Sequence, residues 1–259
     1  MSFIRREGLS LYYEREGSGD PPIVFVHGWC CDHTAFQPQI EHFREKHTVV
    51  AMNLRGCGRS DRPDSGYDIP TLADDVAGLC LQLQLSKPVI VGHSLGGMIA
   101  VEVAARYPSL PHAIVAVDPG PLAPLPHVPQ FFETFATNLE GPDGDSVRRL
   151  YIQALFHPSS PSEWRDTMVG TVCDVPAKIA AAMIRGVASW KGTGALLQCR
   201  TPLLVLLSKT GTSNDPSRLL PLKPDIHIGV TVGASHFMQF DVADQVNLMI
   251  EKFLRMAAK

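Results

Sequence analysis

The hydrophobic positions of this chain fall into short continuous runs separated by amphipathic segments. The apolar runs are PPIVFVHGW (21–29), HTVVAMNLRG (47–56), KPVIVGHS (87–94) and PHAIVAVDPG (111–120). Runs of this kind are typical of strands buried on both faces of a sheet. The segments between them have helical spacing and are residues 34–46, 68–85 (with Thr71 as the expected N-cap) and 95–108. Alternating strands and helices predict an α/β fold, with a mostly parallel sheet covered by helices on both faces.

The two ends of the chain extend this pattern. Residues 2–16 alternate around a turn and predict a hairpin. Apolar runs at 201–208 and 226–233 resume the strands, and residues 243–257 form a closing amphipathic helix.

The alternation stops after Gly120. The stretch PGPLAPLPHVP (119–129) is too rich in proline for long regular structure, and residues 127–190 then have helical character without a strand signal. We therefore expect an α/β core formed by residues 1–120 and 193–259. A helical cap over residues 121–192 is inserted into this core after the sixth strand.

Composition narrows the functional classes. Of 259 residues, 45% are hydrophobic and 19% charged, which allows a sizeable core, and the formal net charge of -3 argues against a nucleic-acid partner. The six cysteines form no C-x-x-C pair, so we expect no metal site. We see neither a signal peptide nor a run near the roughly 18 apolar residues of a membrane span. We expect a cytoplasmic protein without a membrane partner that acts on a small-molecule substrate; its oligomeric state stays open.

The segment GHSLG (92–96) joins a predicted buried strand directly to a predicted helix. A reversal this tight strains the chain, and such strain tends to occur at functional sites. The turn would lift the hydroxyl of Ser94 off the sheet, where it can act as a nucleophile if a base lies nearby. The amide of Leu95, at the start of the helix, could then hold a developing oxyanion.

A histidine later in the chain is the expected base. His236 follows the last predicted strand, at the end of the sheet where sites assemble in open α/β folds. Two residues between Ser94 and His236 are candidates for the orienting acid: Asp118, which ends the strand at 111–120, and Asp215, which follows a long loop. We favour Asp118, because a strand end is better pre-organised than a loop.

A second oxyanion donor and a substrate pocket complete the expected site. The turn after the strand at 21–29 can present the amide of Trp29 beside that of Leu95, whereas His27 is interpreted as a structural turn residue. Apolar side chains of the cap would form the pocket wall. The expected pocket residues are His93, Phe132, Phe135, Trp164, Trp190 and Phe237.

Four motifs together resemble the α/β-hydrolase fold superfamily. They are HGW (27–29), LRGCGRSDRP (54–63), GHSLGG (92–97) and GASHF (233–237). The chain departs from the usual family pattern at Asn53 and Cys57, and it lacks the usual acid shortly after the strand at 201–208. Some branches of the superfamily carry the acid at the position that resembles Asp118, which supports that choice.

The resemblance implies a serine hydrolase with a Ser-His-Asp triad that cleaves a carboxylic ester, a lactone or a similar acyl compound, without cofactor or metal. Two alternatives use the same residues differently. In a cofactor-free dioxygenase or a C–C bond hydrolase, His236 would deprotonate the substrate; the loop LSKTGTSNDP (207–216) mildly resembles the dioxygenase branch. A small-molecule receptor on this scaffold would show tight binding and almost no turnover.

Overall fold

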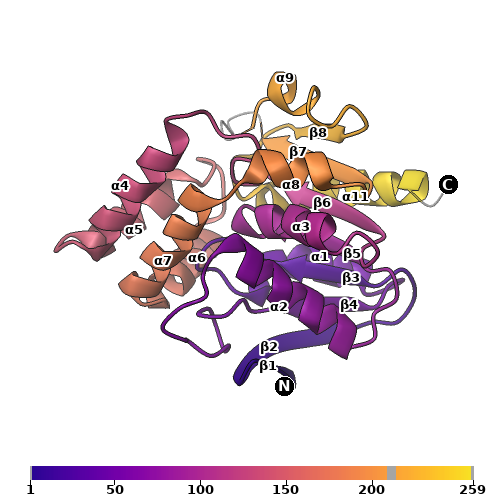
Figure 1. Cartoon of the computed structure of the whole chain (residues 1–259), viewed down its shortest axis with the longest axis horizontal. Coiled ribbons are helices and arrows are strands. Elements are labelled where there is room, and N and C mark those ends of the chain that lie inside the picture. Colours follow the sequence, from indigo (N-terminus) through magenta and orange to yellow (C-terminus); the bar gives the residue numbers. More distant parts are fainter. Residues whose placement is uncertain (1, 209–213, 258–259) are drawn as a thin grey trace.

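A computed structural model describes residues 2–208 and 214–257, and residues 209–213 of the loop noted above lie outside it. Eight strands form one sheet in the order β1-β2-β4-β3-β5-β6-β7-β8 (Figure 1). β2 runs antiparallel to β1 and β4, and the strands from β4 to β8 are parallel. The strands are β1 (Ser2–Arg6), β2 (Leu9–Glu16), β3 (Ile23–Val26), β4 (Val49–Met52), β5 (Val89–His93), β6 (Ala113–Val117), β7 (Leu203–Ser208) and β8 (His227–Thr231). The predicted α/β fold with a mostly parallel sheet is confirmed.

Helices of the core connect or follow these strands. The core helices are η1 (His33–Phe36), α1 (Gln37–Phe43), α2 (Ile69–Gln82), α3 (Leu95–Arg106), α8 (Gly192–Gln198), α9 (Pro216–Leu219), α10 (Met238–Asp241) and α11 (Ala243–Ala257), and α11 has the bounds expected from the sequence. The expected N-cap of α2 was wrong. Asp68 is the N-cap, and its carboxylate accepts hydrogen bonds from the amide and the hydroxyl of Thr71.

Side chains of the central strands alternate between two hydrophobic cores. On β3, Val24 and Val26 pack in the core under α2, α3 and α8, whereas Ile23 and Phe25 pack in the core under α1 and α11. Figure 1 shows α2, α3 and α8 on the near face of the sheet. Because both faces are covered, every position of such a strand is buried, which explains the continuous apolar runs of the sequence.

Between β6 and β7 the chain forms helices only. We call four of them the inserted helices: α4 (Val128–Glu140), α5 (Gly144–Ala154), α6 (Ser162–Asp174) and α7 (Ala177–Ser189). In Figure 1 they lie beside the sheet, while α8 returns to pack against α3. The division of the chain at residues 120 and 192 into core and cap remains a proposal.

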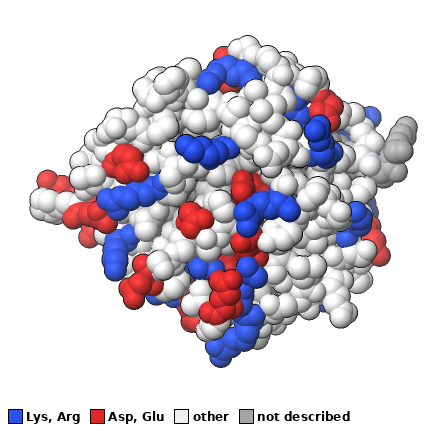
Figure 2. Space-filling model, viewed as in Figure 1, with Lys and Arg blue, Asp and Glu red and all other residues white. Residues whose placement is uncertain are grey.

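Two surface properties bear on possible partners. Within the described residues, no single helix is long and apolar enough to cross a membrane. Helices α6 and α7 taken together have the necessary length and apolar composition, but the chain bends by 95° between them. On the face shown in Figure 2, basic and acidic side chains of the described residues alternate among uncharged ones, and neither sign of charge forms a large patch.

Candidate active site

Ser94 occupies the strained turn between β5 and α3. Its backbone dihedrals are φ 53° and ψ -115°, a left-handed conformation that is unfavourable for a residue with a side chain. Close packing explains why the neighbours are glycines: a Cβ on Gly92 would lie 2.0 Å from the carbonyl oxygen of Gly96, and a Cβ on Gly96 would lie 2.0 Å from that of Val26. The turn therefore tolerates no side chain at either position.

Asp118 is the acid that the structure brings to His236. The Nδ1–H of His236 donates to Oδ2 of Asp118 at 2.7 Å. The other carboxylate oxygen, Oδ1, accepts from the amide of Ser208 at 3.2 Å and lies 3.4 Å from its hydroxyl. Asp118 is only 6% exposed. This hydrogen bond places the imidazole proton on Nδ1 and leaves Nε2 of His236 as an acceptor.

Asp215 has a different position. It is the N-cap of α9, where its Oδ1 accepts from the amide of Ser217 at 2.8 Å. That backbone hydrogen bond lowers the pKa of this exposed carboxyl group. The structure therefore separates the two candidate acids: one binds His236 and the other caps a short helix.

The turn after β3 lies directly against the serine. A Cβ on Gly28 would be 3.2 Å from Cβ of Ser94. Trp29 and Leu95 both line the cavity into which Ser94 opens. Within the described residues, neither of their amides donates a hydrogen bond to the backbone, so both are available to an oxyanion.

His27 has a structural position in this turn. Its Nδ1 donates to the carbonyl of Gly28 at 2.8 Å, and its Nε2 accepts from the amide of Leu54 at 3.0 Å. Complete burial lowers its pKa to about 4, so the ring is neutral at pH 7. With both nitrogens engaged, His27 shapes the turn and has no atom free for substrate.

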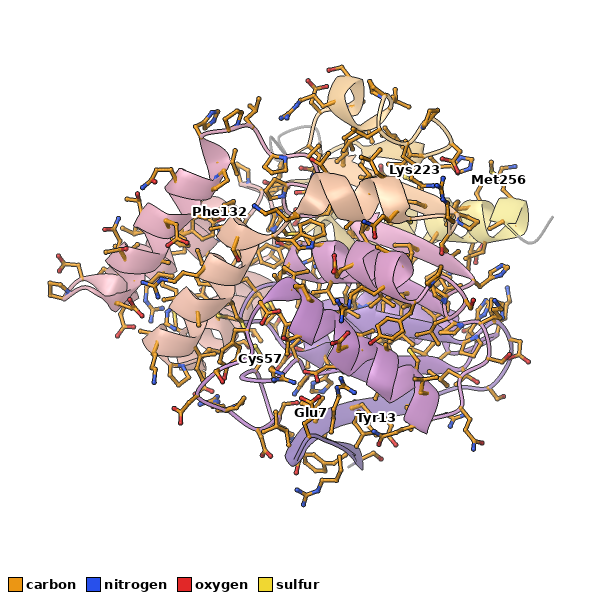
Figure 3. The ribbon with its side chains drawn as sticks, in the orientation of Figure 1. Glu7, Tyr13, Cys57, Phe132, Lys223 and Met256 are labelled. Carbon is orange, nitrogen blue, oxygen red and sulfur yellow. The ribbon has the colours of Figure 1, made fainter. Side chains whose placement is uncertain are left out.

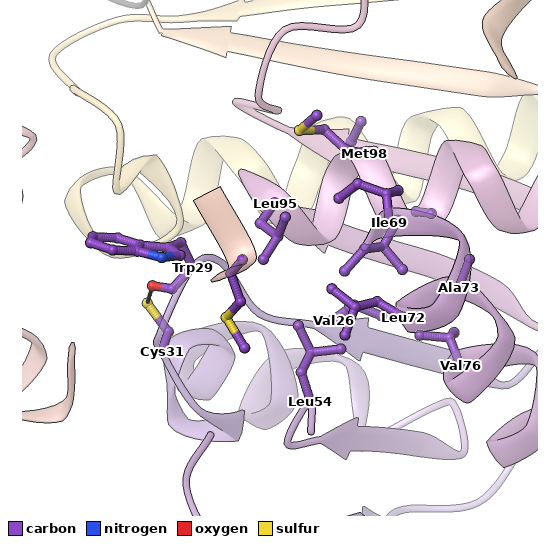
Figure 4. Close-up of a cluster of buried hydrophobic side chains, with 14 of the residues drawn as sticks. Val26, Trp29, Cys31, Leu54, Ile69, Leu72, Ala73, Val76, Leu95 and Met98 are labelled. Carbon is purple, nitrogen blue, oxygen red and sulfur yellow. Dashed lines mark hydrogen bonds between the residues drawn. The ribbon is translucent and has the colours of Figure 1, made fainter. Parts of the chain in front are cut away.

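The side chain of Trp29 joins this turn to the inserted helices. Its Nε1–H donates to the carbonyl of Ala180 on α7 at 2.9 Å. Its ring packs against Phe135 and Tyr151, at centroid distances of 5.7 and 6.0 Å. Figure 4 shows Trp29 beside Leu95, at the edge of the core that also holds Met98. The turn after β3 is thus held from outside the sheet.

His93 supports the loop that carries His236, residues 232–237, which we call the histidine loop. Its Nε2 donates to the carbonyl oxygen of His236 at 2.9 Å, and the two rings lie 4.6 Å apart. Burial, reinforced by the charge of His236, holds the pKa of His93 well below its ordinary value. A neutral His93 adds no repulsion when His236 takes up a proton.

Ser94, His236 and the turn after β3 line one cavity of about 90 Å³. Its wall is mainly apolar and contains Gly28, Trp29, Cys31, His93, Ser94, Leu95, Met98, Gly120, Pro121, Phe132, Tyr151, Ile152, Leu155, Ile184, Val187, His236 and Phe237. Figure 3 shows Phe132 on the inserted helices, at the opposite end of the molecule from Met256. Because the lining residues come from the turns that follow the strands and from the inserted helices, the cavity lies between the carboxyl ends of the strands and those helices.

Three of the six expected pocket residues line this cavity: His93, Phe132 and Phe237. The other three do not line it and have contacts elsewhere. Phe135 packs behind Trp29 and Tyr151. Trp164 stacks on Phe240 at 4.5 Å, and the buried Trp190 donates to the carboxylate of Glu102 at 2.8 Å. These corrections reflect side-chain directions that helical spacing alone does not determine.

Sequence reasoning missed several residues of the site. Ser208 holds Asp118, and Asn214 accepts from the amide of Leu122 at 2.9 Å while its Nδ2 donates to the carbonyls of Pro119 and Gly120. A serine at a strand end and an asparagine in a loop carry no distinctive signal in the sequence. Tyr151, Ile152, Leu155, Ile184 and Val187 were missed as wall residues. Within the described part of the chain, no group of three or more histidine, cysteine or carboxylate side chains could hold a metal ion.

Comparison with known proteins gives concordant results. The sequence profile of the family described as "alpha/beta hydrolase fold" matches residues 21–170. The 2-(acetamidomethylene)succinate hydrolase of Mesorhizobium japonicum is 38% identical over 110 residues, which are 42% of this chain and only 39% of that protein. An esterase from Thermogutta terrifontis superposes with a TM-score of 0.86 at 24% identity, over 100% of both chains. The enol-lactonase from Burkholderia xenovorans gives 0.85 at 20% identity, over 98% of this chain and 100% of that one. At these identities the two structures show similarity of fold alone.

Proposed function

The chain belongs to the alpha/beta hydrolase fold family, and from this premise we propose that it is a serine hydrolase that cleaves a carboxylic ester or lactone. The observation that carries the proposal is the 2.7 Å hydrogen bond from His236 to Asp118, made at the wall of the cavity that also contains Ser94. A serine hydroxyl is a weak nucleophile and needs a base of fixed tautomer beside it. The esterase and lactonase folds noted above agree with this class of substrate.

In the proposed acylation step, Nε2 of His236 accepts the hydroxyl proton of Ser94. The serine oxygen attacks the carbonyl carbon, and the carbonyl oxygen becomes an oxyanion. The amides of Trp29 and Leu95 donate to that oxyanion, and Asp118 stabilises the imidazolium. The imidazolium then returns its proton to the leaving alcohol as the bond between the carbonyl carbon and the alkoxy oxygen breaks. This leaves an acyl-enzyme on Ser94.

In the proposed deacylation step, water replaces the alcohol. His236 takes one proton from the water, and the resulting hydroxide attacks the acyl carbon. The tetrahedral intermediate collapses, Ser94 leaves with the proton from His236, and the carboxylic acid is released. No step requires a group beyond these side chains and the two amides.

Cavity size bears on the substrate. A volume of about 90 Å³ gives room for several water molecules, each of which needs about 10–15 Å³ of such volume. The wall is mainly apolar, and side chains of the inserted helices, such as Phe132 and Ile184, close it. We therefore propose that short, uncharged acyl groups are preferred over long ones.

The test is hydrolysis of p-nitrophenyl esters from acetate to decanoate by the wild type and by Ser94→Ala. We expect wild-type kcat/KM to be highest for the short esters and at least about 10³-fold lower in the variant. Equal rates in the two proteins would overturn the nucleophile assignment. No wild-type turnover above background with any ester would overturn the esterase proposal; oxygen consumption would then test the dioxygenase alternative.

A further inference from the structure

The loop that carries His236 is held by the inserted helices as well as by the core. We propose that Ser160 and Asp241 are positioning residues for His236, acting through a clamp formed by the segment that connects α5 to α6. We call residues 155–164, which are that segment and the first residues of α6, the connector. This inference rests on the proposed function, because it assigns the connector a part in aligning the catalytic base.

The first contact is made by the carboxylate of Asp241, at the end of α10. One of its oxygens accepts from the hydroxyl of Ser160, and the other accepts from the amide of Ser235 at 3.2 Å. Ser160 is buried, at 6% exposure, although it lies on a connecting segment. A single carboxylate therefore ties the connector to the residue immediately before His236.

The second contact is made by His236 itself. Its amide donates to the carbonyl of Leu155 at 3.2 Å, and its carbonyl accepts from Nε2 of His93 at 2.9 Å. One backbone group of His236 is thus held by the connector and the other by the core. Any shift of the connector is passed directly to the backbone that carries the imidazole.

Two aromatic stacks enclose these hydrogen bonds. Phe156 of the connector lies 4.4 Å from Phe237, with the rings inclined by 15°. Trp164 lies 4.5 Å from Phe240, inclined by 29°. Both stacks lie against residues that follow His236, so the connector packs on the segment 237–240.

The loop needs such support because it leaves the edge strand β8 directly into solvent. Val232 is 74% exposed, and Gly233 follows in the left-handed region at φ +79°. A catalytic group must stay within about 0.5 Å of its productive position. A displacement of about 1 Å lowers the rate by about 10²-fold. Loss of the clamp should consequently lower kcat without removing any atom that contacts substrate.

The decisive variant is Ser160→Ala, with Ser159→Ala as its matched control. Ser159 is the preceding residue of the connector, and among the residues that the structure describes its exposed hydroxyl bonds His157 alone. With p-nitrophenyl acetate, we expect kcat of Ser160→Ala to fall about 10- to 100-fold while KM changes less than about twofold. Ser160→Thr, which keeps the hydroxyl, should recover most of the activity, and Ser159→Ala should match the wild type.

A spectroscopic readout makes the test independent of turnover. The proton between Nδ1 of His236 and Asp118 should give a downfield NMR signal in the wild type and in Ser159→Ala. In Ser160→Ala that signal should broaden or disappear, because a mobile imidazole exchanges its proton with solvent. If the wild type hydrolyses no ester, the proposed function fails and this signal alone decides whether the clamp exists.

Two results would overturn the clamp. One is an unchanged kcat and an unchanged NMR signal in Ser160→Ala. The other is a lower melting temperature with kcat and the His236 signal intact, which would show that Ser160 contributes to stability only.

Discussion

Replacing Asp118 by asparagine should remove almost all activity, for a reason that lies in the geometry around its carboxylate. Oδ1 accepts from the amide of Ser208, and Oδ2 accepts from Nδ1 of His236. An asparagine has one oxygen and one NH₂ group, and the Ser208 amide requires the oxygen. The NH₂ group would then face Nδ1 of His236 and force the proton onto Nε2, which could no longer accept the proton of Ser94.

The expected decrease in kcat has two causes, the loss of a hydrogen bond to a charged group and the wrong tautomer of His236. A hydrogen bond to a charged group contributes about 1.5–3 kcal/mol, which corresponds to a loss of about 10- to 150-fold when the imidazolium forms without it. The wrong tautomer adds a further loss. In a Ser-His-Asp triad, the two effects together lower kcat about 10⁴-fold. We expect a decrease of about 10³- to 10⁴-fold for Asp118→Asn.

The assay is steady-state hydrolysis of p-nitrophenyl acetate, with Asp215→Asn as the matched control. Asp215 is exposed and caps a helix of four residues, so its replacement should change kcat less than about twofold. Circular dichroism must show that both variants are folded. A loss in Asp215→Asn comparable to that in Asp118→Asn, or full activity of Asp118→Asn, would refute the reasoning.

Three further predictions concern stability and are all measured by urea unfolding. Asp75→Asn should lower the free energy of unfolding by about 3–5 kcal/mol, because its buried carboxylate pairs with the buried Arg55 at 2.6 Å and with Arg6 at 3.0 Å, and both cations lose their partner; a change below about 1 kcal/mol would contradict this. Trp29→Phe should lower it by about 0.5–1.5 kcal/mol, because the hydrogen bond from the indole to the carbonyl of Ala180 is lost, and an unchanged value would show that the bond is unimportant. The folded pKa of His27 is about 4, against 6.5 when unfolded, so the unfolded chain binds more protons between these values. Stability should therefore fall by about 3 kcal/mol as the pH is lowered from 6.5 to 4, and a flat profile would contradict neutral burial.

The fold could be predicted from the sequence because the central strands are covered on both faces. β3, β4, β5, β6 and β7 are buried at every position, which gives apolar runs that no solvent-facing strand would show. β8 was also predicted, although it is an edge strand with a partly exposed pattern. The short helices α9 and α10 were not predicted, since a single turn carries no periodicity.

The candidate site could be predicted only as far as local sequence determines it. Ser94 and His236 could be proposed from the sequence because each follows a strand within a glycine-containing turn. The choice between Asp118 and Asp215 stayed open in the sequence, since it depends on which strand end lies nearest His236. The support from Ser208 depends on the same spatial arrangement.

The wall of the cavity was the least predictable part. Phe135, Trp164 and Trp190 are of residue types common in pockets, yet each packs against a partner that is distant in the sequence, and none of them lines the cavity. An amphipathic helix shows which face is apolar. It does not show whether that face meets another helix or a substrate.

The central claim is that Ser94 becomes covalently acylated, and the most direct measurement is mass spectrometry of the enzyme quenched during turnover of p-nitrophenyl acetate. We predict one added acetyl group, located on the peptide that contains Ser94 and absent from Ser94→Ala. Acetylation of another residue, or ester turnover with no acylated Ser94 at any quench time, would contradict the account.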